Sequence, residues 1–487
     1  MKKKRLISAS LFCLALWCAI VGFYQTHKSL PEDLDYRGEE YLVAVSNIEF
    51  LNDLSWVDEK GHTHHEQEIF DTLFALIEGA ERYILVDMFL FNSYGGKDAI
   101  FYKDLSTRLT ELLVRKKKAV PGIDIDFITD PINTVYGGSE SSEIEQLKSV
   151  GVNVIITGLE GLRDSNFIYS SLWRTFLQWF GNSKEGGWLP HPFSPGDDKV
   201  TLRSYLRLRN FKANHRKIVV VDSGDDMATM VASANPHGGS SAHSNVALVV
   251  RGPLWRSVYQ AEAAVAALSG STLSRVSQPI AGPQRLNLPA VSGRVRILTE
   301  QQIKNGLLTC IDSAVPADSL KIAQFYLADR DIVEALIGAA AKGVEVKIVL
   351  DPNKDAFGYE KNGIPNRQTG YELIRRSAQK IQLRWYDTHG EQFHSKLFVL
   401  QSGGKMTVIL GSANLTRRNL DNFNLELDIQ LVIDTDTEIA RSIVDYFNRI
   451  WVNENGIYTL KKEAYEDDSF GKRALYRIQE RFGLSTF

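Results

Sequence analysis

The chain has 487 residues, of which 44% are hydrophobic and 24% are charged, and its formal net charge is −3 at pH 7. This composition is that of an ordinary globular protein long enough for two or three domains, which excludes a disordered or low-complexity chain. The slight net acidity gives no overall attraction to polyanions, so a basic binding surface would have to be local.

The first feature along the chain is an uncharged segment of 19 residues, Leu6 to Tyr24, that follows four basic residues. As a helix this segment would reach roughly 28 Å, which is long enough to cross a bilayer. Because no good pair of small residues marks a cleavage site, an uncleaved signal anchor is favoured over a cleaved signal peptide, and both are favoured over a buried core helix. The basic flank should stay inside, so we expect the body of the chain outside the membrane.

Cysteine usage adds little. Cys13 and Cys18 lie in the apolar segment, which leaves Cys310 as the single cysteine of the body. The body therefore has no intrachain disulfide, a pattern that is compatible with a bacterial periplasm without proving it.

The body of the chain has the pattern of an α/β fold that occurs twice. Apolar periodicity predicts a helix, a strand, a helix and a strand in the first half, and a strand, a helix and a strand in the second. These elements are 69–77, 83–91, 105–114 and 123–131, followed by 320–329, 332–341 and 344–352. A segment rich in Ser, Gly and Pro at 268–293 lies between the halves and is predicted to be a linker.

A repeated polar motif makes this duplication specific. The stretch "ANHRKIVVVDSG" (213–224) places a histidine and a lysine two residues apart at the start of an apolar strand, and "FHSKLFVLQSGG" (393–404) repeats it. A constant spacing of 179 residues joins four pairs, which suggests that no gap intervenes: His215 and His394, Lys217 and Lys396, Asn235 and Asn414, Asn245 and Asn424. We therefore predict two homologous α-β-α sandwich halves that form a pseudo-twofold pair.

The predicted organisation has five parts. They are a signal anchor at 1–30, a first domain at 40–267, the linker at 268–293, a second domain at 294–457, and a C-terminal helical tail at 458–487.

The two motifs suit the cleavage of a phosphodiester. Residues two apart at a strand end face the same side, so a pseudo-twofold axis would gather two imidazoles, two ammonium groups, two carboxamides and two hydroxyls in one pocket. One neutral histidine would attack phosphorus while the other protonates the departing alkoxide, and fixed donors would stabilise the negative charge of the transition state. The predicted catalytic residues are His215, Lys217, Asn235, His394, Lys396 and Asn414, with Ser233 and Ser412 as substrate-binding residues. No metal or other cofactor is required by this chemistry.

At these residues the sequence resembles the phospholipase D superfamily, whose mark is His-x-Lys-x4-Asp followed by a Gly/Ser-rich segment and Asn, present twice. The first copy matches with His215, Lys217 and Asp222, although Ala232 stands where glycine is usual. In the second copy Gln401 replaces the aspartate. The resemblance implies a phospholipase D-like fold for the whole body and a phosphohistidine intermediate.

Family members often place an acid beyond the Asn to hold the second ring nitrogen of the histidine. Glu426 fills this place in the second half, and Ala247, 179 residues earlier, fills it in the first. We therefore expect Glu426 to orient His394 and His215 to lack such a partner. The order of the chain in relatives favours His215 as the nucleophile, whereas the surviving carboxylate favours His394.

Two further segments bear on the substrate. The aromatic-rich stretch Phe167 to Phe193 either forms an amphipathic lid that dips into a membrane or is a core helix with a loop. The basic residues Arg203, Arg207, Arg209, Lys212 and Arg216 either attract anionic lipid headgroups or form the solvated side of a strand. His237 and His243 are candidate headgroup contacts.

The sequence therefore predicts a phospholipase D or bacterial cardiolipin synthase-like enzyme, anchored in a bacterial inner membrane with its body in the periplasm or outside. Its partners would be a phospholipid substrate, the membrane, and water or an alcohol as acceptor. The alternative is an exported nuclease of the same superfamily, which the net charge disfavours. A noncatalytic membrane-tethered binding protein is the third interpretation, which the intact motifs disfavour. The headgroup and the oligomeric state are not indicated.

One smaller cluster was considered as a metal site. His62, His64, His65 and Glu66 lie within six residues of one another, but an exposed approach to a helix is the favoured interpretation.

Overall fold

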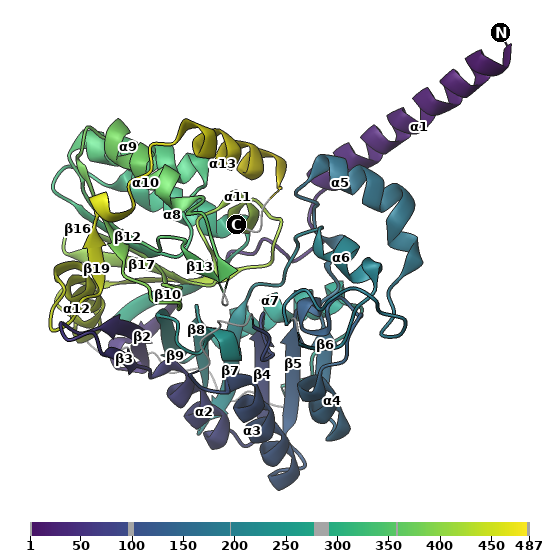
Figure 1. The fold of residues 1–487 in the computed structure, drawn as a ribbon. Coiled ribbons are helices and arrows are strands. Elements are labelled where there is room, and N and C mark those ends of the chain that lie inside the picture. Colours follow the sequence, from purple (N-terminus) through teal and green to yellow (C-terminus); the bar gives the residue numbers. More distant parts are fainter. Residues whose placement is uncertain (1, 96–101, 195, 277–291, 357–358, 485–487) are drawn as a thin grey trace.

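The computed structural model describes residues 2–95, 102–194, 196–276, 292–356 and 359–484. Its body consists of two mixed β-sheets, one in each half of the chain, with helices on their outer faces (Figure 1). This is the predicted fold class. Most of the linker predicted at 268–293 lies outside the described residues, and α7 (Trp255–Leu268) and β10 (Ser292–Thr299) bound it.

The first sheet has eight strands in the order β3-β2-β9-β8-β7-β4-β5-β6. The parallel strands β4, β5 and β6 carry the predicted helices between them, and β7, β8 and β9 run antiparallel. The strands span Thr63–Glu66, Ile48–Val57, Asn245–Arg251, Asp226–Ala232, Lys217–Ser223, Tyr83–Met88, Asp124–Thr129 and Asn153–Ile156, in sheet order. Three amphipathic helices cover the outer face, α2 (Ile69–Gly79), α3 (Leu105–Ala119) and α4 (Ser142–Ser149).

The second sheet repeats this plan in nine strands, in the order β1-β10-β18-β17-β16-β11-β12-β15-β19. After β10, its strands are β18 (Leu427–Asp434), β17 (Lys405–Gly411), β16 (Lys396–Ser402), β11 (Ser319–Gln324), β12 (Glu345–Leu350) and β15 (Ile381–Tyr386). The outer helices are α8 (Gln301–Ser313), α9 (Arg330–Lys342) and α10 (Asn366–Arg376). A short hairpin of β13 (Asp355–Ala356) and β14 (Tyr359–Glu360) lies apart from both sheets.

The inner faces of the two sheets share one hydrophobic core. Val231 and Leu248 of the first sheet belong to the same buried cluster as Val408 and Leu431 of the second, and α7 and α12 (Glu438–Val452) complete it. Since apolar strands that are buried on both faces need cover on both sides, the halves stabilise each other by stacking. The motif strands β7 and β16 lie in the middle of their sheets, so their ends meet at the junction of the halves.

The chain crosses between the halves at both of its ends, which the predicted boundaries did not anticipate. Residues 41–44, assigned to the first domain by the sequence, form β1 (Tyr41–Ala44), which adds to the edge of the second sheet beside β10. In the predicted tail, β19 (Thr459–Lys461) pairs with β15, and only then does the chain form α13 (Phe470–Phe482).

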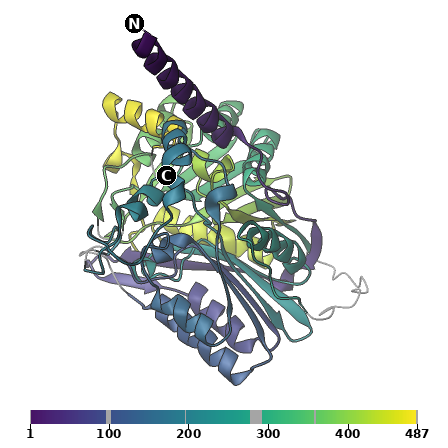
Figure 2. The same ribbon diagram turned by 90° about the vertical axis from the view of Figure 1, so that its right-hand side faces the viewer.

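The N-terminal helix α1 (Lys2–His27) stands out from the body (Figures 1 and 2). Among the described residues it is the one helix that is long and apolar enough to span a membrane, with a mean hydropathy of 2.3 and almost no burial. Its lower end packs on α5 (Phe167–Leu172), where Gly22 lies against Phe167 and Ser171. This helix fits a single membrane anchor.

Candidate active site

The two motifs meet because each half lends a backbone bridge to the other. The main-chain NH of His215 donates to the carbonyl of Leu425 (2.8 Å), and the NH of His394 donates to the carbonyl of Ser244 (2.8 Å). These are short parallel β-bridges, Asn214 to Leu425 and Ser244 to Phe393. Each histidine is therefore placed next to the residue that follows the bridge in the opposite half.

Both histidines are held through Nδ1 by a side chain from the other half. Glu426 Oε2 lies 2.9 Å from His215 Nδ1, and Asn245 Oδ1 lies 3.2 Å from His394 Nδ1. The prediction that Glu426 orients His394 and that His215 lacks an orienting group is therefore wrong. The parallel bridges cross the partners over, so the carboxylate of the second half belongs to the histidine of the first.

The structural counterpart of Glu426 is Asn245, not Ala247. Ser412 Oγ donates to Glu426 and accepts from the NH of Leu427, while Ser233 Oγ donates to Asn245 Oδ1 and accepts from the NH of Val246. The offset between the halves thus changes from 179 to 181 beyond Asn414, because the second half holds two extra residues there. One histidine therefore has a carboxylate partner and the other a carboxamide.

These same contacts correct the role predicted for the two serines. Ser233 and Ser412 are completely buried and lie outside the lining of the pocket described below. Their hydroxyls hold Asn245 and Glu426 in position, so both serines act through the orienting groups and do not bind substrate.

The two lysines occupy matching positions beneath the histidines. Lys217 Nζ donates to the carbonyl of His215, and Lys396 Nζ donates to the carbonyl of His394 (2.8 Å). Each ammonium also lies 5.1 Å from the centre of a phenylalanine ring, Phe89 in the first half and Phe325 in the second. The same rings lie 4.8 Å from the ring centre of His215 and 5.0 Å from that of His394. Sequence reasoning missed this aromatic pair because the phenylalanines lie on β4 and β11 ends at unequal spacing from the motifs.

One cavity of about 400 Å³ at the junction of the halves collects the predicted groups. His215, His394, Asn235 and Asn414 line it, and Lys217 and Lys396 lie just outside its surface. Asn414 Oδ1 is buried and has no hydrogen-bond partner among the described residues, so it is available to a ligand donor. The remaining wall is largely apolar and aromatic, with Phe89, Leu90, Ile132, Phe193, Phe211 and Phe325.

Burial dominates the electrostatics of this site. It lowers the pKa of both histidines well below the usual value, and the two lysines add to the effect. It also lowers the pKa of Lys217 to about 7 and raises that of Glu426 to about 7. A bound phosphodiester anion would favour the protonated forms of the lysines and histidines, so the empty site is tuned for an anion.

Two buried aspartates that the sequence analysis did not include in the site fix its loops. Asp130 Oδ2 accepts from the NH of Asn214 (2.7 Å), and Asp351 Oδ2 accepts from the NH of Phe393 (2.8 Å). Each aspartate therefore anchors the residue that directly precedes a catalytic histidine candidate.

The basic stretch identified before the first motif does not form one surface. Arg216 is fully buried between Glu262 (3.0 Å) and Glu300 (2.7 Å), and Lys212 is buried against Asp164. His237 lines the cavity, and the ring centre of His243 lies 5.9 Å from that of His394. In the His62 to Glu66 segment, His62 and His64 contact Asp58, and no group of three metal-ligating side chains occurs within the described ranges.

Residues 307–451 match the family model described as "Cardiolipin synthase, PLD-like domain". Two curated relatives named cardiolipin synthase 2, from Bacillus anthracis and Bacillus cereus, are 20% and 21% identical over 93% of this chain and 75% of their own length. The crystal structure of phosphatidylserine synthase from Haemophilus influenzae matches with a TM-score of 0.55 at 10% identity, covering 93% of this chain and 96% of that one. That similarity concerns the fold. The resemblance predicted from the double motif is confirmed.

Proposed function

We propose that this phospholipase D-like protein is a membrane-anchored phosphatidyltransferase that forms a phosphohistidine intermediate on His215. The coarser statement, a phospholipid-modifying enzyme of the phospholipase D type, follows from the family match and the curated relatives. The finer one rests mainly on one observation, the lining of a single cavity by two histidines whose Nδ1 atoms are held across the junction of the halves.

The unlike partners of the two histidines support different roles. When His215 Nε2 attacks phosphorus, the imidazole becomes cationic, and the carboxylate of Glu426 at Nδ1 stabilises that charge. Asn245 is a neutral acceptor and gives His394 the same orientation with much less stabilisation of its cation. His394 is therefore the stronger acid when protonated, which suits the group that delivers a proton to the departing alkoxide.

The reaction proceeds in two displacements. In the first, a bond forms between His215 Nε2 and phosphorus, the bond from phosphorus to the headgroup oxygen breaks, and His394 gives that oxygen its proton. In the second, the acceptor hydroxyl gives its proton to His394, its oxygen attacks phosphorus, and the electron pair of the N–P bond returns to His215. The cations of Lys217 and Lys396 balance the charge on the nonbridging oxygens, each contributing perhaps ~3 kcal/mol if well aimed.

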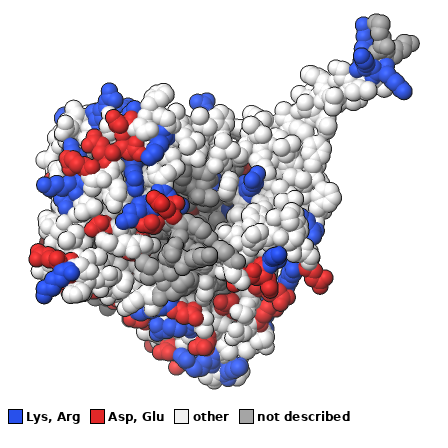
Figure 3. Space-filling view, viewed as in Figure 1, with Lys and Arg blue, Asp and Glu red and all other residues white. Residues whose placement is uncertain are grey.

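The surface around the anchor supports a lipid substrate. Ile168, Trp179 and Phe180 are 69%, 74% and 67% exposed and lie on or just after α5, beside the lower end of α1. On the face shown in Figure 3, charged side chains are sparse over this part of the molecule and frequent over the outer helices of both halves. An apolar face continuous with a membrane-spanning helix would rest in the interfacial region of the bilayer. The aromatic wall of the active-site cavity would then accept the glycerol backbone and the start of the acyl chains.

The activity is tested with the purified, detergent-solubilised full chain and phosphatidylglycerol, with and without labelled glycerol. We expect glycerol release or exchange, and a fall of about a thousandfold in both the His215→Ala and His394→Ala variants on this substrate. Phosphatidate as the sole product would show hydrolysis, whereas cardiolipin or labelled phosphatidylglycerol would show transfer. Activity on DNA and on no lipid would contradict the proposal and support the nuclease alternative.

A further inference from the structure

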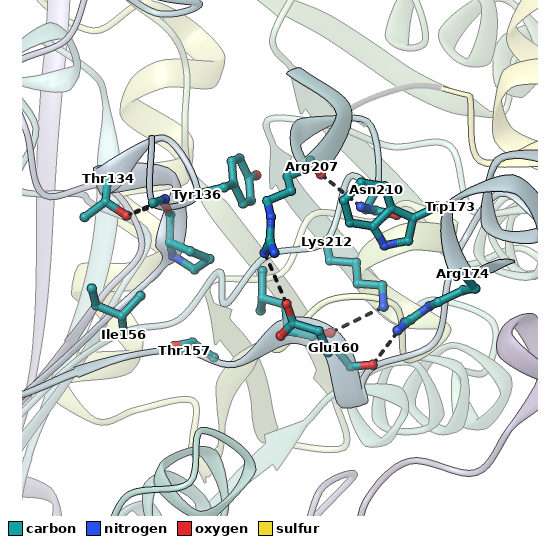
Figure 4. A pocket seen from close by; sticks show the side chains of 13 residues that line it. Thr134, Tyr136, Ile156, Thr157, Glu160, Trp173, Arg174, Arg207, Asn210 and Lys212 are labelled. Carbon is teal, nitrogen blue, oxygen red and sulfur yellow. Dashed lines mark hydrogen bonds and ion pairs between the residues drawn. The ribbon is translucent and has the colours of Figure 1, made fainter. Parts of the chain in front are cut away.

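A second cavity of about 280 Å³ lies in the first half, and the catalytic chemistry does not use it. Its wall includes Arg174, Arg207 and Lys212, and the ends of these side chains gather above Glu160 (Figure 4). The volume is just below the range of about 300–1,000 Å³ that suits drug-sized ligands. It therefore fits a polar headgroup and not a complete lipid.

The positive charge around this cavity is only partly balanced. Asp164 is a single buried carboxylate that serves two cations, Arg174 (2.9 Å) and Lys212. Burial and the nearby Arg174 lower the pKa of Lys212 to about 7, although Asp164 opposes that shift. Arg207 reaches only the exposed carboxylate of Glu160, at 3.4 Å, and its Nε is buried with no hydrogen-bond partner among the described residues. An anion in the cavity would supply the missing counter-charge.

The two cavities are neighbours. Tyr136 and Lys212 line both of them, so a molecule bound in the second cavity lies one side chain away from the catalytic pocket. A hydroxyl attached through a short linker to a group held there can extend into the pocket that His215 and His394 line.

The cavity also lies directly under the apolar face near the anchor. Trp173 and Arg174 belong to the π-helical turn Trp173–Leu177, and both line the cavity while Phe176 on the same turn is exposed. Single π-helical turns are frequent at functional sites. A lipid whose headgroup occupies the cavity would have its chains toward the exposed apolar surface.

We infer that this cavity is a phosphate-binding subsite for the acceptor of the transfer reaction, a phosphate ester that carries a free hydroxyl, such as the glycerophosphate headgroup of a second lipid. This inference rests on the proposed function and adds the class of acceptor to it. Arg207 and Lys212 bind the acceptor phosphate. The acceptor hydroxyl then forms the new O–P bond as the N–P bond to His215 breaks, and its proton passes to His394.

The test compares Arg207→Gln with the control Arg209→Gln, which removes the same charge from an exposed side chain outside the cavity. With the full chain in micelles of labelled phosphatidylglycerol, we expect Arg207→Gln to raise the KM for glycerol 3-phosphate about tenfold and to slow cardiolipin formation similarly. Hydrolysis and incorporation of labelled glycerol, which has no phosphate, should stay within about twofold of the parent protein. Arg207→Lys should restore part of the loss.

Several outcomes would overturn the inference. Equal losses with glycerol and with glycerol 3-phosphate would show that Arg207 has a structural role, as would equal losses in the Arg209→Gln control. A change with soluble glycerol 3-phosphate but none in cardiolipin formation would make the ligand a free phosphate ester and refute the lipid acceptor. If the parent protein releases no headgroup from any lipid, the proposed function itself fails.

A binding measurement keeps the subsite testable without activity. Calorimetric titration of the full chain with inorganic phosphate should give two sites, one in each cavity, in the parent protein and in Arg209→Gln, and one site in Arg207→Gln. A single site in the parent protein, or two sites in Arg207→Gln, would refute the subsite whether or not the protein acts on lipids.

Discussion

Glu426 Oε2 lies 2.9 Å from Nδ1 of His215, although 211 residues separate them and they belong to opposite halves of the chain. The corresponding contact on His394 is made by Asn245, a carboxamide, at 3.2 Å. The active site is therefore pseudosymmetric in position and asymmetric in charge. Neither half holds a complete site, and the charge difference supports separate roles for the two histidines.

The role assignment predicts a dependence on the leaving group. A protonated His394 matters most when the leaving alkoxide is basic, so a p-nitrophenol ester of phosphatidic acid should depend on it little. We expect His394→Ala and Asn245→Leu to lose about a hundredfold more activity on phosphatidylglycerol than on the p-nitrophenyl ester, whereas His215→Ala loses both equally. The reverse pattern, with His215 dispensable for the activated ester, would exchange the two roles.

The pH profile follows from Glu426 and Lys217. Burial raises the pKa of Glu426 to about 7 and lowers that of Lys217 to about 7. Since the mechanism uses the ionised carboxylate and the protonated lysine, kcat/KM should rise as Glu426 loses its proton and fall as Lys217 loses its own, with a maximum near pH 7. Bound substrate stabilises the lysine cation, so the alkaline limb of kcat should lie at higher pH. Initial rates between pH 5.5 and 8.5 test this, and a flat profile of kcat/KM would contradict it.

The apolar face beside α1 predicts an effect that depends on the form of the substrate. Replacing Trp179 and Phe180 together by serine removes two large, exposed apolar side chains. We expect activity on long-chain lipid in vesicles to fall several-fold, while activity on a soluble short-chain phospholipid stays unchanged. Val452→Ser, at the 64% exposed end of α12, serves as the control. Equal losses on both substrates would mean that this face supports the fold and not membrane contact.

The buried Arg216 predicts a large loss of stability. Its guanidinium joins Glu262 and Glu300 beneath the first motif, and all three side chains are fully buried. Arg216→Met leaves two buried carboxylates without their cation, which should cost about 3–5 kcal/mol in the free energy of unfolding. Thermal melting monitored by circular dichroism measures it, with Arg209→Gln as the exposed control. A change below about 1 kcal/mol would show that these carboxylates do not rely on Arg216.

The sequence was sufficient to predict the two halves and the pair of histidines, because the 179-residue spacing is constant from His215 through Asn235 and from His394 through Asn414. It did not predict the partners of the histidines. The later pair Asn245 and Asn424 keeps that spacing by coincidence of residue type, and the two extra residues before Glu426 leave no visible break. Only the β-bridges between the halves reveal that Asn245 occupies the place of Glu426.

The fate of the other polar residues was hidden for a related reason. Arg207, Lys212 and Arg216 are close neighbours in sequence, yet they lie respectively at a cavity wall, in a buried ion pair with Asp164 and between two buried glutamates. A run of basic residues carries no information about which side chains are buried when their partners come from distant segments. Burial of this kind is decided by packing between elements, which periodicity does not encode.

The central claim is a covalent intermediate on His215 in a site built from both halves. Full-length protein mixed with phosphatidylglycerol labelled with ³²P, quenched in denaturant and digested under alkaline conditions, allows the labelled peptide to be identified by mass spectrometry. We predict acid-labile label on the peptide that contains His215, increased in amount by His394→Ala when the p-nitrophenyl ester is the donor, and absent from His215→Ala. Label on His394, or active enzyme that carries no label on either histidine, would contradict the account.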